Sequence, residues 1–112
     1  MISGAHVVIH SRDSAADLAF FRDVLGLKHV DAGRGWLIFA LPPAETAIHP
    51  SDENDKHQLY LMCDDLQAET TALAAKNVIC GPVQEARWGS ITTLPLPGGG
   101  QVHLYQAKHP RP

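Results

Sequence analysis

The sequence has few cysteines, no long apolar run and no block of like charge. Its two cysteines, Cys63 and Cys80, match neither a Cys-x-x-Cys motif nor a disulfide framework, which favours buried thiols in a reducing compartment. The longest nearly apolar stretch, residues 36–44, is far shorter than the roughly 20 residues that a membrane helix needs. Nine Lys and Arg against twelve Asp and Glu give no electrostatic support to nucleic-acid binding.

The amino terminus also has no basic region followed by an apolar segment, so the sequence predicts a cytoplasmic protein without a secretory signal. With 45% hydrophobic and 19% charged residues, the chain has enough apolar material for a core and too little charge for intrinsic disorder. Its 112 residues are the length of one domain, so we expect residues 1–112 to fold as a single unit.

The first half of the chain alternates between strand and helix patterns. Residues 5–10 read as a strand with His6 and His10 on one face. Capping side chains then precede apolar residues at helical spacing, which predicts a helix from about 14 to 25 that ends at Gly26. Three short strands are predicted after it, at residues 28–31, 36–41 and 45–49.

The second half repeats this order after a polar loop at residues 50–56. A strand at 57–63 is followed by a helix capped by Asp64 or Asp65, which ends at Asn77. Strands are then predicted at residues 78–83, 87–94 and 101–106, with a hairpin turn at 97–100.

The repeated order predicts an α+β fold of two βαβββ modules, at about 4–49 and about 57–106. Neither module buries enough surface to be stable alone, so we expect the two to share one core. Their curved mixed sheets would then be related by a pseudo-twofold axis and would surround a common cleft, which is a natural place for a small-molecule ligand.

Three segments resemble the vicinal oxygen chelate superfamily, the group of glyoxalase, bleomycin-resistance and extradiol-dioxygenase proteins. They are Phe-Arg-Asp-Val-Leu-Gly-Leu at 21–27, Leu-Tyr-Leu-Met-Cys-Asp-Asp at 59–65, and Leu-Pro-Gly-Gly-Gly-Gln-Val-His-Leu-Tyr at 96–105. The resemblance covers nearly the whole chain and implies the same two-module fold. It says much less about function, because one fold hosts many chemistries.

In metal-using members, the resemblance implies ligands on the first and last strands of each half. Those positions hold His6, His49 and His103, and the remaining ligand falls at His57 or Gln58. One residue of slip reverses the face of a strand, so the choice between His57 and Gln58 stays open. Imidazole ligands suit zinc, nickel or iron.

The alternative is that these histidines are polar residues lining the pocket of a member without a metal. Glyoxalase chemistry needs a base beside the metal, and no candidate position supplies a carboxylate. Glu45 shares a strand face with His49 but would lie about 13 Å away, so it is expected at the rim or in solvent. A neutral imidazole of His49 or His103 could abstract the proton instead, which makes these two the candidate catalytic residues.

Candidate ligand-binding residues are His10, Trp36, Gln58, Tyr60 and Trp88. By resemblance His10 would contact an anionic group, although it could simply end an edge strand in solvent. The two tryptophans would stack on a planar ligand or else fill the core. Tyr60 would share the cleft with Gln58, whereas it would face the helices if His57 faces the cleft.

The remaining candidates have weaker patterns behind them. Arg87 would either clamp a carboxylate or be solvated, and His29 and His109 are expected to be ordinary surface residues.

Two functions compete for this pattern. One is a metal-dependent lyase or isomerase that acts on a small carbonyl compound through an enediolate. The other is a metal-free binding protein of bleomycin-resistance type that sequesters a small aromatic or peptide-like ligand. Extradiol ring cleavage has less support because it needs the absent glutamate. The resemblance further implies a homodimer.

Overall fold

The computed structural model describes residues 6–48 and 50–110, which form two helices and two sheets. The helices are α1 (Ser14–Asp23) and α2 (Leu66–Ala74). The strands are β1 (His29–Asp31), β2 (Leu37–Phe39), β3 (Tyr60–Met62), β4 (Gln84–Glu85), β5 (Gly89–Pro95) and β6 (Gln101–Ala107). None of the helices in these ranges is long and apolar enough to cross a membrane.

Both helices begin at aspartates that satisfy free backbone N–H groups of the first turn. Asp13 Oδ1 accepts a hydrogen bond from the Ala16 N–H at 3.1 Å, and Asp65 Oδ1 accepts one from the Ala68 N–H at 3.0 Å. Of the two predicted caps of the second helix, Asp65 is therefore the one used. Gly26 adopts a φ of 67° just beyond α1, where a side chain would be strained.

The larger sheet contains four strands in the order β3-β6-β5-β4. β3 runs parallel to β6, whereas β6 with β5 and β5 with β4 are antiparallel. The second half thus has the predicted order of strand, helix and three strands, and its sheet is mixed. β1 and β2 form a separate antiparallel hairpin, whose turn is held by the Asp31 carboxylate through the N–H groups of Gly33 and Gly35.

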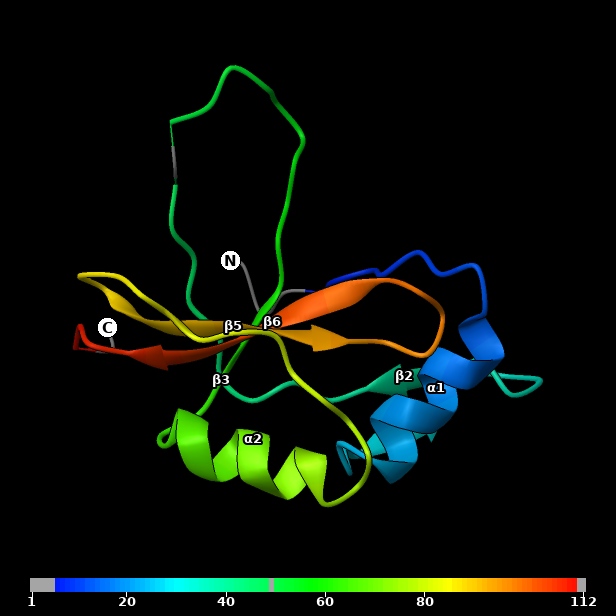
Figure 1. Ribbon diagram of the computed structural model, residues 1–112. Coiled ribbons are helices and arrows are strands. Elements are labelled where there is room, and N and C mark those ends of the chain that lie inside the picture. The colour runs from blue at the N-terminus through cyan, green and yellow to red at the C-terminus, as the bar shows by residue number, and fades with distance from the viewer. Residues whose placement is uncertain (1–5, 49, 111–112) are drawn as a thin grey trace.

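The elements form layers with one shared core. In Figure 1, α2 lies under one face of the larger sheet, and α1 lies beside the β1–β2 hairpin. Residues 41–48 and 50–58, which we call the arch, rise from the opposite face of the larger sheet. Buried side chains of both halves make up the core, so the prediction that the halves share a core agrees with the structure. They are Phe20, Phe21, Leu66, Leu73, Leu94, Leu96, Val102 and Leu104.

Two of the strands predicted in the first half are absent from the described residues. Residues 6–10 and 45–48 form no strand, and apolar side chains in both segments are exposed, Val8 at 66% and Ile48 at 91%. Alternating polar and apolar residues fit a strand, but a strand also needs a hydrogen-bonded neighbour, which alternation alone does not reveal. Pro42 and Pro43, just before the second of these segments, also have no N–H to donate to a ladder.

The structure also corrects one strand of the second half. Residues 78–83 were expected to be a strand, but β4 begins only at Gln84. Gly81 still follows β5 through one backbone bond, from its N–H to the Thr93 carbonyl at 3.0 Å. Pro82 has no N–H with which to extend that pairing.

Both cysteines fit the expectation of buried thiols in part. Cys63 and Cys80 are free and half-buried against the core. Burial raises the pKa of both thiols, which keeps them protonated and poorly nucleophilic.

Candidate functional site

Strand β6 divides its side chains between the core and the face away from α2. Gln106 Oε1 accepts a hydrogen bond from the Leu66 N–H at the start of α2, at 2.8 Å, so even-numbered residues of β6 face the helix. Gln101, His103 and Tyr105 therefore point to the other face of the sheet. The candidate site lies on this face.

The parallel pairing of β3 with β6 places Tyr60 directly beside His103. Their rings stack with centroids 4.6 Å apart and planes 19° apart. The Tyr60 hydroxyl donates to Gln58 Oε1 at 3.3 Å, so Gln58 lies on the same side as Tyr60. Both alternatives precede β3: Gln58 contacts Tyr60, the neighbour of His103, and His57 is exposed.

Two more rings complete what we call the aromatic cluster, which consists of Tyr60, Trp88, His103 and Tyr105. Tyr105 meets Trp88 edge to face at 5.3 Å and Tyr60 at 5.9 Å, and Trp88 meets Tyr60 at 6.3 Å. The Tyr105 hydroxyl donates to the Trp88 carbonyl at 3.2 Å. Trp88 is 39% exposed whereas Tyr105 is 7% exposed, so the cluster has an anchored base and an accessible edge.

Tyr105 was missed as a site residue although it belongs to the motif at 96–105. Its ring lies over Gly89, where the Cβ of any larger residue would overlap it. Burial raises the pKa of the Tyr105 phenol, and the nearby Glu45 carboxylate raises it further. Tyr105 is therefore a protonated hydrogen-bond donor at neutral pH. The available signal was Gly89, which directly follows Trp88. A glycine in a strand often marks a place where another group, here a ring, approaches the backbone closely.

His103 contains a polar atom without a partner. Its Nδ1 is buried and has no hydrogen bond to any residue that the structure describes. Leaving such a nitrogen unpaired costs about 1–3 kcal/mol, and this kind of cost is typical of functional sites. Among the predicted site residues that the structure describes, His103 is the one whose polar group is both buried and unsatisfied.

Two residues that the sequence placed outside the site lie against the cluster. The His109 ring is 5.9 Å from the Tyr105 ring, and its Nε2 lies 3.3 Å from Glu45 Oε2, a contact that is an ion pair when the imidazole is protonated. His109 is therefore not an ordinary surface residue. Glu45 keeps the predicted rim position, but it reaches the second half of the chain from the arch.

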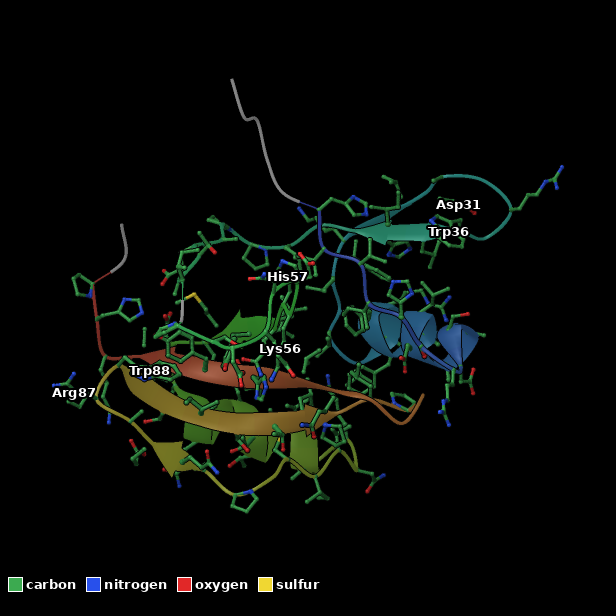
Figure 2. All side chains as sticks on the ribbon, turned by 90° about the horizontal axis from the view of Figure 1, so that it is seen from above. Asp31, Trp36, Lys56, His57, Arg87 and Trp88 are labelled. Carbon is green, nitrogen blue, oxygen red and sulfur yellow. The ribbon has the colours of Figure 1, made fainter. Side chains whose placement is uncertain are left out.

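The other predicted site residues do not join the cluster. Trp36 is 71% exposed on the β1–β2 hairpin, and Figure 2 shows it at the end of the molecule opposite Trp88. His6 and His57 are exposed, and His49 lies outside the described residues. His10 lines a separate cleft of about 390 Å³ between the segment before α1 and the turn after β5, together with Arg12, Asp17 and Gln101.

The predicted metal ligands can be compared with the geometry of residues 6–48 and 50–110. Within these ranges no three His, Cys, Asp or Glu side chains lie close enough together to hold a metal ion. His103 and Gln58 are neighbours of Tyr60, but a third donor is not grouped with them. The described residues therefore do not fit a divalent metal.

Substitution of Gly89 by alanine tests the packing of the cluster. The new Cβ would overlap the Tyr105 ring and displace it from Trp88. We expect the free energy of unfolding to fall by about 1–3 kcal/mol and the near-ultraviolet circular dichroism of the aromatic rings to change. Gly100→Ala is the matched control, because nothing lies within 4 Å of a Cβ there. Equal effects of the two substitutions would contradict this packing.

Comparison with known proteins yields matches among solved structures, whereas no family model and no curated protein matches the sequence. An antibiotic binding protein from a Streptomyces species superposes with a TM-score of 0.64 at 19% identity, over 93% of this chain and 100% of that chain. Lactoylglutathione lyase from Agrobacterium tumefaciens gives a TM-score of 0.65 at 18% identity, over 95% of this chain and 94% of that chain.

A member of the glyoxalase/bleomycin resistance protein/dioxygenase superfamily from Sphaerobacter thermophilus gives a TM-score of 0.58 at 19% identity, over 94% of this chain and 98% of that chain. At such identities the likeness is one of fold, and one fold carries many activities. The resemblance read from the motifs is confirmed at this level: the chain has the α+β fold of the glyoxalase, bleomycin-resistance and dioxygenase proteins.

Proposed function

We propose that the protein binds a small planar organic ligand at the aromatic cluster and does so without a metal. The observation that carries the proposal is the gathering of Tyr60, Trp88, His103 and Tyr105 on the sheet face away from α2. Aromatic side chains offer large contact area at low conformational cost, and a few polar groups beside them give orientation. An antibiotic binding protein with the same fold adds support.

The polar groups of the site suit a ligand with hydrogen-bonding atoms at its edge. The Gln58 side chain uses its oxygen for the Tyr60 hydroxyl, and its amide N–H groups are donors. The His103 Nδ1 is buried under the Tyr60 stack. A ligand that shifts the Tyr60 ring would give this nitrogen access to a partner and would remove the cost of leaving it unpaired.

Quinoline, a flat neutral bicyclic molecule, is a suitable probe for the proposal. We expect Trp88→Ala to weaken quinoline binding about tenfold, because the exposed edge of the cluster is lost. Trp88→Phe should have a smaller effect, since it keeps a ring at the same place. Binding is measured by isothermal titration calorimetry or by chemical-shift changes of the tryptophan indole N–H groups.

Trp36→Ala is the control for this experiment, because Trp36 is exposed at the opposite end of the molecule. It should leave quinoline binding unchanged. The proposal fails if wild-type protein does not bind quinoline, or if Trp36→Ala weakens binding as much as Trp88→Ala does.

A metal-dependent lyase or isomerase is the second candidate, and the unpartnered Nδ1 of His103 is the observation in its favour. Its ligands would be His6, His49, His57 and His103 with zinc, nickel or iron, as the resemblance implies. The absence of a third grouped donor among the described residues weighs against it. His49 and His103 as proton-transferring residues belong to this candidate alone.

Elemental analysis of protein purified without a histidine tag separates the two candidates. We expect no stoichiometric zinc, nickel or iron, either in the wild type or in a His6→Ala, His49→Ala double variant. Near-stoichiometric metal that disappears in the double variant would favour the lyase or isomerase over the metal-free binding protein.

We also propose that two copies of the chain associate as a homodimer. Exposed apolar side chains support this, since Val7, Val8 and Ile48 lie in segments with a strand pattern and no strand partner. Sedimentation velocity should give twice the chain mass for the wild type. A Val7→Ser, Val8→Ser variant should shift toward monomer, whereas Val83→Ser, at an exposed position of the second half, should not. A wild type that sediments as a monomer would refute the pairing.

A further inference from the structure

The carboxyl-terminal end of the described chain inserts a basic side chain between the aromatic cluster and a carboxylate. The His109 ring lies 5.9 Å from the Tyr105 ring, and Nε2 is 3.3 Å from Glu45 Oε2. Its other nitrogen, Nδ1, is 2.8 Å from the Pro110 carbonyl oxygen. Both ring nitrogens therefore face oxygen acceptors, and the imidazolium form can donate to both of them.

The Glu45 carboxylate places a negative charge beside the aromatic cluster. Its side chain is 23% exposed although it comes from the arch, and that of His109 is 34% exposed. Its charge also reaches the aromatic cluster, because it contributes to raising the pKa of the Tyr105 phenol. A negative charge at this distance attracts a positive group, so the place beside the carboxylate favours a cation.

Two other basic residues of the second half, Lys108 and Arg87, are directed elsewhere. Lys108 Nζ pairs with Glu85 Oε2 at 2.8 Å and donates to the Ala86 carbonyl at 3.1 Å. Figure 2 shows Arg87 pointing away from the sheet at the end of the molecule. His109 contacts both the Tyr105 ring and the Glu45 carboxylate, so it holds the position between them.

We propose that this position is the cation subsite of the aromatic cluster, and that His109 occupies it until a ligand displaces the imidazole. The inference rests on the proposed function and narrows its ligand to planar molecules with a positively charged nitrogen. Such a nitrogen would lie against the face of the Tyr105 ring and beside the Glu45 carboxylate, as cations do in aromatic cages. The flat part of the ligand would extend toward Tyr60 and Trp88.

The test compares N-methylquinolinium, a flat permanent cation, with quinoline at neutral pH, where the weakly basic quinoline is uncharged. We expect the wild type to bind the cation about fivefold more tightly, measured by isothermal titration calorimetry. Glu45→Gln should remove this preference and leave quinoline binding unchanged. Glu53→Gln changes the same charge elsewhere on the arch, so it should keep the preference.

His109→Ala gives an independent readout of displacement. Without the imidazole, N-methylquinolinium no longer competes with a side chain for Glu45, so its affinity should rise several-fold while that of quinoline changes little. His109→Lys puts a permanent cation beside Glu45 and should bind N-methylquinolinium more weakly than His109→Ala does. These two variants test the subsite even if Glu45→Gln disturbs folding, which urea unfolding would reveal.

The outcomes separate this inference from the proposed function. Equal affinities for the two probes in the wild type, or a preference that survives in Glu45→Gln, would overturn the cation subsite and leave the aromatic binding site intact. Failure of the wild type to bind either probe would overturn both.

Discussion

The parallel register between β3 and β6 is the constraint on which the candidate site depends. It sets Tyr60 opposite His103 and Met62 opposite Tyr105, so these four side chains share one face of the sheet. A slip of one residue would turn Tyr60 toward α2 and bring Leu61 to the exposed face. The core holds this register in place, because Leu61 and Leu104 pack among the apolar side chains on the other face.

How much of this could be read from the sequence differs between the two halves of the chain. In the second half, helical spacing and an aspartate cap correctly predicted α2, and alternation correctly predicted β5 and β6. In the first half, α1 and the hairpin were predicted, but residues 6–10 and 45–48 form no strand. The alternation of polar and apolar residues shows which side chains would share a face of a strand. Whether the segment finds another strand to pair with depends on tertiary structure.

The same difference applies to the site residues. Tyr60, Gln58, Trp88 and His103 were chosen from strand positions in the second half, and the structure brings these four together. Trp36 occupied a corresponding position in the first half, yet it lies at the far end of the molecule. Glu45 and His109 are sixty-four positions apart in the chain and follow no common pattern, so their ion pair could be found only in the folded structure.

The hydrogen bond of the Gln106 side chain affects which parts of the molecule unfold locally and which unfold only with the whole protein. By accepting the Leu66 N–H, its side-chain amide provides a bond that the first turn of α2 cannot make within the helix, so this turn and the end of β6 support each other. Phe20 and Phe21 instead join the first half to the core mainly through apolar packing, and the Asp17 carboxylate adds one bond to the Gly98 N–H. Amide protons of β5 and β6 should therefore exchange with solvent only on global unfolding, while those of the β1–β2 hairpin exchange through smaller, local openings.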